Sequence, residues 1–297
     1  MDVRIPVDSA SRLAWTETAQ GSRLSHRLFS NIGDPAQASN FFQINDYYPQ
    51  EKASDWCRAY LSSAFEHLIM WADYVAPLKF HPEQVVTFSL RPVYTLARAA
   101  LEASAQAVWM QSGGSARECA RRHLSLIRWD FEEHRKSQMT AAAKQRVRAR
   151  DALLLKRIDG VFAEQEIKPP SGYLSVIRDA CAAIDRDPDV VERVWRASSG
   201  AAHGKHWPSL ALQHVIPTVE YEPGQFRALR IPDAKGMTEA LLVAYEMTQY
   251  GALQFADFCG ADIAELTKDA RIWLAGVIPL KDDADPETLR RLRRDED

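Results

Sequence analysis

Hydrophobic and polar positions follow a helical period along most of this chain. Over residues 53–78, large apolar side chains recur at roughly helical spacing, namely Trp56, Tyr60, Phe65, Leu68 and Trp71. Apolar residues that return every three or four positions are typical of a helix with one buried face. Clusters of Pro, Gly and Ser separate further segments with this period. We therefore predict more helices over about 84–112, 115–138, 142–165, 172–185, 188–203 and 236–259, and a shorter one ending near 275.

The period changes between residues 212 and 232. Here β-branched and aromatic residues flank the turn sequence EPGQ, which is the pattern of a β-hairpin. Pro217 and Pro232 would confine it to a small, edge-like ribbon, because proline cannot donate to a strand ladder. We find no βαβ alternation and no glycine-rich phosphate loop. The predicted fold class is therefore all-α, a multi-helix bundle with a small late β-hairpin insertion.

Both ends of the chain differ from its middle. Residues 1–50 are polar and interrupted by Pro and Gly, which predicts an N-terminal arm, and the aromatic stretch NFFQINDYYPQ could lie against the body. Residues 51–277 form the predicted helical domain. Residues 278–297 are almost wholly charged, which predicts a solvated tail.

Composition narrows the class of protein. Among 297 residues, 46% are hydrophobic and 26% charged, values typical of globular proteins. The formal net charge of −3 argues against a general nucleic-acid coat. The four cysteines include no C-x-x-C pair, so buried reduced thiols are expected rather than zinc ligands or a disulfide framework. With no signal-like apolar start and no bilayer-length apolar run, we expect a cytoplasmic protein without a membrane partner.

The helix predicted over 84–112 carries charge on one line. Its charged residues after Phe88 are Arg91, Arg98 and Glu102, and at 100° per residue they lie within about 40° of one another. The remaining surface is apolar, which indicates a central helix whose charges must be paired or face a cleft. Arg98 and Glu102 could form a structural ion pair. Alternatively these three residues bind substrate. One carboxylate does not neutralise two guanidinium groups, so one positive charge would remain for an anionic ligand. Pro92 could also kink this helix.

The stretch RVWRASSGAAHGKHW combines a helix end with residues that can do chemistry. Arg196, Ser199 and His203 are spaced i, i+3 and i+7, so they share one helical face over about 10 Å. Gly204 is suited to end the helix in a left-handed conformation, and Pro208 to prevent its resumption. His203 would then lie in the last turn, where free carbonyls favour the protonated imidazole and raise its pKa.

An arginine, a hydroxyl and a histidine on one face suit acid–base chemistry on a phosphodiester. Arg196 and His203 are therefore the candidate catalytic residues. The candidate substrate-binding residues are Ser199, Arg91, Arg98, Glu102 and His206. The structural alternative is that Arg196 pairs with Glu192 while His203 caps helix carbonyls.

Metal binding is a weaker interpretation of the same stretch. His203 and His206 could be ligands, with His214 of the predicted hairpin as a third. Histidines spaced H-x-x-H across a helix break make a poor zinc pattern, because a structural site needs further ligands nearby. We therefore expect no metal site and no cofactor.

Basic residues concentrate in one part of the chain. Between Arg117 and Asp159 there are 12 Lys and Arg residues against 6 Asp and Glu residues. Positive helices of this kind can guide RNA through phosphate contacts. The alternative is an ordinary solvated helical face whose basic residues have acidic partners of their own.

Residues 55–260 resemble the HEPN superfamily, the higher eukaryotes and prokaryotes nucleotide-binding domains. These are small α-helical bundles with an arginine and a histidine, separated by four to six residues, on a late helix. In this chain the matching motif is RASSGAAH, from Arg196 to His203. The segment RPVYTLARAALEASAQAVW, with Arg91, Arg98 and Glu102, looks like the arginine- and glutamate-bearing helix of some bacterial HEPN-like proteins.

The resemblance implies a metal-independent endoribonuclease of a toxin–antitoxin, abortive-infection or CRISPR-linked defence system. It implies a homodimer that acts on RNA, with an antitoxin protein as a further partner. Arg196 would bind the scissile phosphate, and His203 would move a proton during attack by the RNA 2′-hydroxyl. Active members usually have a polar residue directly after the motif arginine, where this chain has Ala197. The alternative is a non-catalytic interaction module in which the Arg, Glu and His residues form a structural network.

Overall fold

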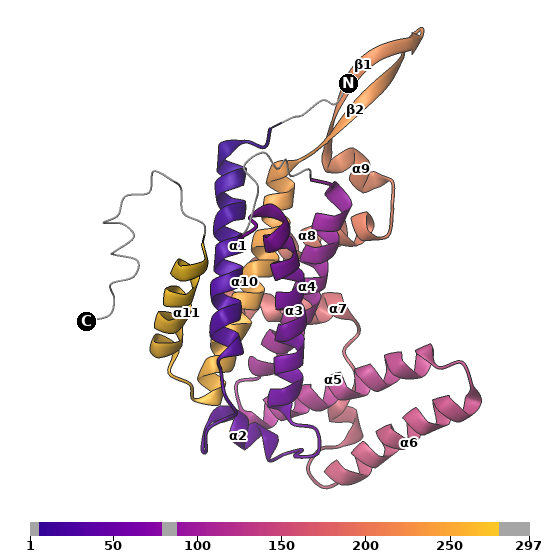
Figure 1. Ribbon diagram of the computed structural model, residues 1–297. Coiled ribbons are helices and arrows are strands. Elements are labelled where there is room, and N and C mark those ends of the chain that lie inside the picture. The colour runs from indigo at the N-terminus through magenta and orange to yellow at the C-terminus, as the bar shows by residue number, and fades with distance from the viewer. Residues whose placement is uncertain (1–5, 79–87, 279–297) are drawn as a thin grey trace.

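The computed structural model describes residues 6–78 and 88–278, which form an all-α bundle with one late β-hairpin (Figure 1). This architecture confirms the predicted fold class. Long helices lie side by side in the bundle, a helical arm extends from its lower end, and the hairpin projects from its upper end. The predicted charged tail, apart from its first residue, lies outside the described residues, as does the start of the helix predicted from residue 84.

The segment predicted to be an N-terminal arm is instead a helix of the bundle. α1 (Ser9–Ser30) begins after Asp8, whose side chain accepts a hydrogen bond from the Ser11 backbone N–H at 2.9 Å. The helix packs against α3, α10 and α11 and buries Trp15 and Phe29. The arm prediction was therefore wrong.

The reason lies in the composition of the buried face of α1. Several of its buried residues are small and polar, including Thr18 and Ser22. Their hydroxyls donate to backbone carbonyls one turn earlier, to Ala14 and Thr18 respectively, both at 2.7 Å. These groups are satisfied inside the helix and can be buried. A pattern based on large apolar residues does not detect such a face.

Three helices form the centre of the bundle. α3 (Ala53–Val75) and α10 (Ala234–Cys259) pack against α4 (Leu90–Gln111), which also contacts α7 and α8. At Gly251 of α10 an added Cβ would lie 2.9 Å from Leu61 Cδ2 and 3.1 Å from Val108 Cγ2. The three backbones therefore approach closely at this point.

Pro92 does not interrupt α4. The helix begins at Leu90, so the proline lies in the first turn. Its missing N–H removes no helical hydrogen bond there. The predicted kink therefore has no cause at this position.

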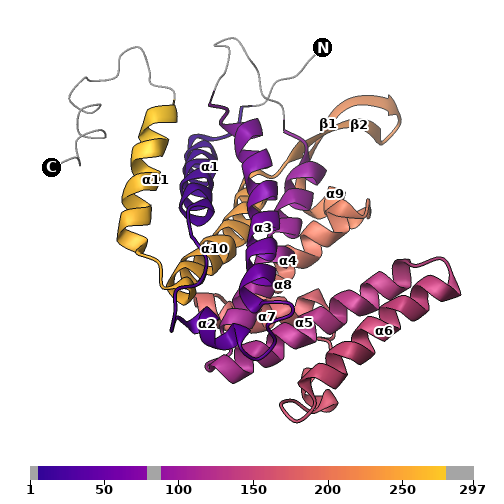
Figure 2. The ribbon, with the colours of Figure 1, turned by 60° about the horizontal axis from the view of Figure 1, so that its bottom comes forward.

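Two antiparallel helices form the arm at the lower end (Figure 2). α5 (Ala116–Ser137) runs outward and α6 (Ala141–Ile158) returns, with the Thr140 hydroxyl accepting from the Ala143 N–H at 3.1 Å. The short 3₁₀ helix η1 (Glu164–Ile167) then contacts α5. The arm is the most basic part of the chain by sequence.

Smaller elements cover one side of α4 (Figure 1). α7 (Tyr173–Cys181) is followed by the 3₁₀ helix η2 (Ala182–Ile184). α8 (Pro188–Ala202) then packs on both α4 and α7, and α9 (Trp207–Ala211) follows it. α8 carries most of the residues that the sequence singled out.

The hairpin consists of β1 (Gln213–Glu222) and β2 (Gln225–Pro232), paired antiparallel. Its base is closed by a hydrogen bond from the Asp233 N–H to the Leu212 carbonyl at 2.9 Å. Most of its side chains are exposed, including large apolar ones, namely Val215, Ile216, Val219, Tyr221 and Phe226. The hairpin therefore stands beside the bundle and contributes little to the core.

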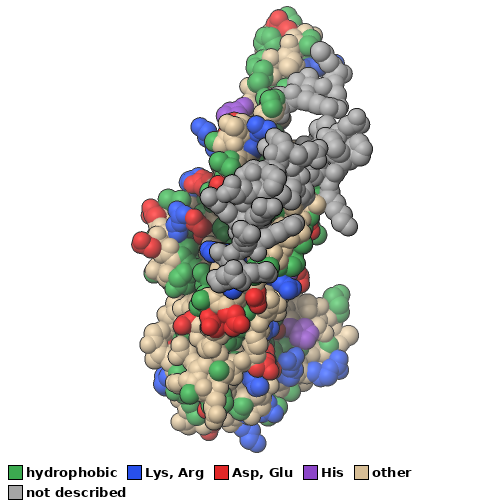
Figure 3. All heavy atoms as spheres, turned by 60° about the vertical axis from the view of Figure 1, so that its left-hand side comes forward, with side chains coloured by type: hydrophobic (Ala, Val, Ile, Leu, Met, Phe, Trp, Pro, Cys, Tyr) green, Lys and Arg blue, Asp and Glu red, His purple; other side chains and the backbone are tan. Residues whose placement is uncertain are grey.

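Two helices complete the described chain. α2 (Asn40–Asn45) buries Phe41 and Ile44 of the aromatic stretch, and α11 (Ile263–Val277) packs on α1. On the side of the molecule that carries α11, basic and acidic side chains are interspersed with hydrophobic ones (Figure 3). All four cysteines are free and buried, as predicted. Among the described helices, none combines the length and apolar character that crossing a bilayer requires.

Candidate functional site

The C-terminal end of α8 is built by a local turn motif. Gly204 has a φ of 69°, and its N–H donates to the Ala201 carbonyl at 3.2 Å. The next N–H, that of Lys205, donates to the Gly200 carbonyl at 2.9 Å. This pair of bonds is the Schellman ending, which needs a left-handed residue after the C-cap. Gly204 therefore ends the helix as predicted, and His203 is the C-cap residue.

Pro208 does not prevent a further helix. It lies in the first turn of α9, a position where proline lacks no helical hydrogen bond. α9 folds back tightly on α8, because a Cβ at Gly200 would lie 2.9 Å from both Trp207 and Pro208. α8 is thus not resumed after Gly204, and a separate short helix that the sequence did not predict begins at Trp207.

Arg98 lies at the centre of a polar cluster between α4 and α8. Its Nε donates to Glu102 Oε1 at 2.7 Å, and the same oxygen accepts from Trp195 Nε1 at 2.8 Å. The Arg98 guanidinium also lies over the Trp195 ring, 5.5 Å from its centroid. The ion pair that the sequence allowed within α4 is thus present, and it extends to the next helix. We refer to Arg98, Glu102, Trp195 and His203 as the Arg98 cluster.

His203 completes this cluster and is exposed. Its Nε2 lies 3.1 Å from Arg98 NH1, although the two residues are 105 positions apart in sequence. A guanidinium has only donors, so the contact uses Nε2 as the acceptor and leaves the ring proton on Nδ1. In this contact the acceptor nitrogen of His203 faces an arginine.

Arg91 binds the end of α8 rather than a carboxylate. NH1 donates to the Ala201 carbonyl at 2.8 Å and NH2 to Ser209 Oγ at 3.2 Å. No described carboxylate oxygen lies within 4.0 Å of its guanidinium nitrogens. The Arg91 side chain therefore binds the Ala201 carbonyl at the end of α8, whereas the His203 ring contacts Arg98. Of the two arginines of α4, only Arg98 pairs with Glu102.

Arg196 has a different partner from His203. Its Nε donates to Glu192 Oε1 at 2.7 Å, and its side chain is 60% exposed. Hydrogen bonds from Arg196 and then from Arg178 lower the pKa of Glu192. Arg196 lines an open hollow with Trp207, and His203 is not among the residues of that hollow. The two candidate catalytic residues share a helix face, but they do not share a cleft within one subunit.

The remaining candidates lie at the edges of this site. Ser199 is half-buried on the same face of α8, between Arg196 and His203. His206 is exposed at the start of α9. Within residues 6–78 and 88–278, no three His, Cys, Asp or Glu side chains are grouped so that they could hold a metal ion.

Ala197 lies on the opposite side of α8 from the Arg98 cluster. It is 6% exposed and belongs to the buried stripe with Val194 and Ala201. A polar side chain at this position would therefore enter the core. The departure from the HEPN pattern is consistent with the way this helix packs.

Two aromatic residues of this site, Trp195 within the cluster and Tyr173 beside it, were not predicted from the sequence. Trp195 lies outside the buried stripe of α8. A large aromatic residue at such a position is a sequence signal that its ring packs on a neighbouring helix. Tyr173 begins α7, is 39% exposed, and packs against Trp129 with ring centroids 4.7 Å apart. Burial raises the pKa of Tyr173, and the charge of Glu102 raises it further, so its ring lies close to the cluster. No sequence signal marked Tyr173.

Comparison of this chain with family models, curated proteins and solved structures finds no match. The resemblance to the HEPN superfamily stays a prediction.

Proposed function

We propose that this protein acts on RNA as a metal-independent, HEPN-like endoribonuclease in which His203 transfers the proton. The observation that supports this most is the 3.1 Å contact between the exposed His203 Nε2 and Arg98. Arg91 lies at the same helix end, bonded to the Ala201 carbonyl. An imidazole beside guanidinium groups offers proton transfer and charge stabilisation for a phosphodiester at one place.

The proposed step begins with phosphate binding. A phosphate oxygen bound by Arg98 takes over the N–H that now points at His203 and frees Nε2 to accept the 2′-hydroxyl proton. The 2′-oxygen then bonds to phosphorus while the bond to the 5′-oxygen breaks. The products are a 2′,3′-cyclic phosphate and a 5′-hydroxyl. The 5′-oxygen takes its proton from the protonated histidine of a second copy, so the proposed active form is a homodimer.

In this proposal Arg196 and Ser199 bind the neighbouring part of the strand. Arg196 uses only Nε for Glu192, which leaves its terminal nitrogens for a phosphate. His206 extends the same edge beyond the helix. The context of bacterial defence or toxin–antitoxin stress, the cytoplasmic location and an antitoxin partner are proposed on the HEPN resemblance alone.

A second candidate function is that of a non-catalytic regulatory module. The hydrogen bonds within the Arg98 cluster favour this function, because Glu102 accepts from both Arg98 and Trp195 and so has protein partners without a ligand. Arg91 likewise directs its donors to the end of α8. In that role the cluster fixes α8 against α4 and presents a surface to a partner.

Cleavage of labelled single-stranded RNA in the presence of EDTA tests the catalytic proposal. We expect wild-type protein to cleave, and His203→Ala to lose about 100-fold or more in rate, because acid–base catalysis contributes at least this much. Arg98→Ala should lose a similar factor. The matched control is His214→Ala, which removes a histidine that is 71% exposed on the hairpin.

Two results would overturn the catalytic proposal. One is the absence of metal-free cleavage by the wild type on any long RNA, and the other is an equal rate for wild type and His203→Ala. Melting temperatures of all variants belong to the test, because Arg98→Ala also leaves Glu102 and Trp195 with fewer partners. His203 is exposed, so His203→Ala should melt close to the wild type.

A further inference from the structure

Basic side chains of the α5–α6 arm differ in whether they have acidic partners. Near the bundle, Arg121 and Arg122 both pair with Glu118, and Arg128 pairs with Asp151 and Glu164. Elsewhere on the two arm helices, six cations have no carboxylate oxygen of any described residue within 4.0 Å. These are Arg135, Lys144, Arg146, Arg148, Lys156 and Arg157. Cations without carboxylate partners, gathered on one pair of helices, attract a polyanion.

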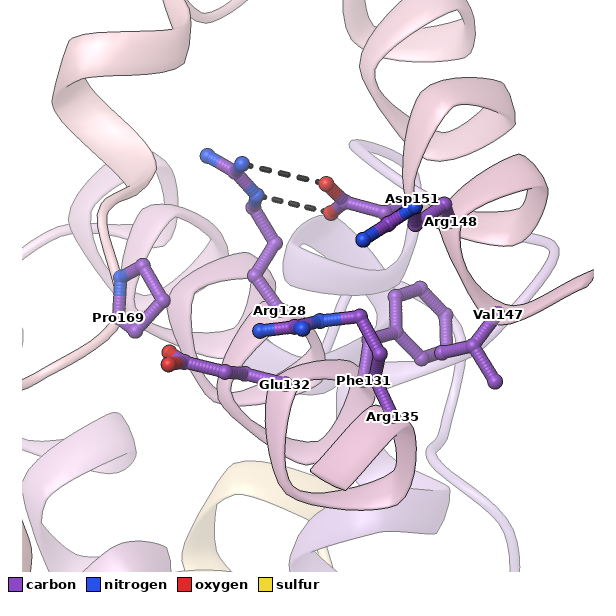
Figure 4. A pocket seen from close by; sticks show the side chains of 8 residues that line it. All are labelled: Arg128, Phe131, Glu132, Arg135, Val147, Arg148, Asp151 and Pro169. Carbon is purple, nitrogen blue, oxygen red and sulfur yellow. Dashed lines mark hydrogen bonds and ion pairs between the residues drawn. The ribbon is translucent and has the colours of Figure 1, made fainter. Parts of the chain in front are cut away.

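A cavity of about 270 Å³ lies between the two helices and is lined by two of these six cations (Figure 4). Arg135 reaches into it from α5 and Arg148 from α6, so that the two guanidinium groups approach one space from opposite sides. Phe131 and Val147 form an apolar wall. The cavity thus combines the guanidinium groups of Arg135 and Arg148 with an apolar surface.

The acidic side chains of the cavity each have a cationic partner. Asp151 accepts from Arg128 through two bonds, 2.9 Å from Nε and 3.3 Å from NH2. Glu132 lies 3.4 Å from the Lys136 ammonium. Among the side chains that line the cavity, three arginines stand against two carboxylates, so the lining is net positive, and Arg135 and Arg148 are the arginines without a carboxylate partner. Guanidinium forks match the oxygen geometry of phosphate, and arginine is enriched wherever phosphate is recognised.

Aromatic residues lie between this cavity and the Arg98 cluster. Pro169 lines the cavity, and the chain runs from it through the loop into α7, which begins at Tyr173. Tyr173 packs on Trp129 of α5 and is partly exposed. In Figure 1, α7 lies between the arm and α8. Exposed aromatic rings next to a cationic groove are the pattern by which proteins bind single strands, with bases stacked on the rings.

We propose that the cavity between α5 and α6 binds backbone phosphates of single-stranded RNA and that Tyr173 stacks a base as the strand passes to the Arg98 cluster. The proposal rests on the proposed function in taking RNA as the ligand. A strand is favoured over a single free phosphate because the unpaired charge continues along the cavity's side of α6 at Lys144, one turn before Arg148 on the same helix face.

Fluorescence anisotropy with a labelled 20-nucleotide single-stranded RNA, titrated with full-length protein at several salt concentrations, tests the site. The double variant Arg135→Gln/Arg148→Gln should bind at least about tenfold more weakly, and its slope of log K against log salt should fall by about 0.7 for each phosphate that the variant no longer binds. Tyr173→Ala should weaken binding about fivefold or more. The charge-matched control is Lys268→Gln/Arg271→Gln on α11, where both side chains are exposed.

Equal affinities for the wild type and the arm variant, or equal losses in arm variant and control, would overturn the site. Competition by polyglutamate as effective as that by unlabelled RNA would also overturn it, in favour of an acidic protein partner. Cleavage of a dinucleotide separates this proposal from the catalytic one, because so short a substrate cannot reach from the cluster to the arm. The arm variant should cleave the dinucleotide at the wild-type rate, whereas His203→Ala should keep its affinity for the long strand. If no RNA is cleaved but the arm variant still binds more weakly, the catalytic proposal fails and the arm site stands.

Discussion

His203 and Arg196 show how two side chains on one helix face acquire different surroundings. Both lie on the outer stripe of α8, but Arg196 is inside the helix and meets Glu192 one turn earlier. His203 is the C-cap residue, where the chain leaves the helix, and its ring reaches Arg98 of the neighbouring α4. The helix face that the two residues share was correctly predicted from their spacing, whereas the contact of His203 depended on the position of α4.

Removing Glu102 should weaken the contact between α4 and α8. Glu102→Ala takes away the acceptor of Arg98 Nε and Trp195 Nε1, and the Arg98 and Glu102 side chains are only 18% and 15% exposed. Loss of hydrogen bonds to a partly buried charged group should lower the free energy of unfolding by about 2 kcal/mol. Urea denaturation measures this change.

Glu192→Ala is the matched control for that experiment. It likewise removes a carboxylate that accepts from two side chains, here Arg178 and Arg196, but the Arg196 side chain is 60% exposed. Exposed ion pairs contribute less than about 1 kcal/mol. If both variants lose the same stability, the Arg98 cluster does not fix α8 on α4.

Buried His123 should make stability depend on pH. Its Nε2 donates to the Glu51 carbonyl at 2.7 Å, while Nδ1 is buried without a partner among the described residues. Burial lowers its pKa from 6.5 to about 4. Between these two values the unfolded chain binds the proton and the folded chain does not, so acid favours unfolding. Stability present above about pH 6.5 should be lost as the pH falls toward 4, on the order of 3 kcal/mol.

Comparison with His123→Gln isolates this effect from that of the carboxylates. The glutamine amide can keep a donor for the Glu51 carbonyl but does not titrate. The difference in unfolding free energy between the two proteins, measured in urea from pH 7 to pH 4, should shrink as the pH falls. Parallel curves would show that His123 is not responsible.

Among the elements, the hairpin and the α5–α6 arm are the two that project from the bundle. Both are antiparallel pairs that leave the core and return to it (Figures 1 and 2). The arm carries its own buried residues, among them Phe131, Val147 and Leu154. The hairpin has mainly exposed side chains, and a two-stranded ribbon alone is marginally stable.

Deleting the hairpin should therefore leave the bundle intact. The Asp233 N–H donates to the Leu212 carbonyl at 2.9 Å, so a short glycine linker can replace residues 213–232. Because the deletion removes little of the core, the melting temperature should change by less than about 3 °C, which corresponds to about 1 kcal/mol for a domain of this size. Circular dichroism measures it. A decrease of more than about 6 °C would show that the hairpin stabilises the bundle.

At the scale of the whole molecule, all four cysteines report on the integrity of the core. They are free and buried. Burial raises the pKa of Cys181 and of Cys259 to about 11 and also raises that of Cys57. The thiolate is the reactive form, so buried thiols of raised pKa are inert.

Thiol labelling should therefore follow global unfolding. With Ellman's reagent at pH 8, the folded protein should react slowly, whereas the protein in guanidinium chloride should release the colour of four thiols. The midpoint of labelling after a brief pulse should coincide with that of circular dichroism. Rapid labelling of one thiol under native conditions would indicate that its region opens locally.

Features that depend on neighbours in the sequence were predicted, and features that depend on residues far apart in the sequence were not. Helices, the hairpin and the ending at Gly204 were predicted, because periodicity and turn chemistry act over a few neighbouring residues. α1 was missed because hydroxyls bonded to its own backbone allow a polar-looking face to be buried. Tyr173 was missed because only the packing of α7 brings it near Glu102.

The sequence by itself determined the fold class, the central position of α4 and the single face shared by Arg196, Ser199 and His203. Only the tertiary structure decided that His203 meets Arg98, that Arg196 is held by Glu192 in a separate hollow, and that Arg135 and Arg148 face one cavity. The physical reason is that a helical pattern fixes the direction of a side chain about its own axis. The partner it meets depends on where packing places the next helix.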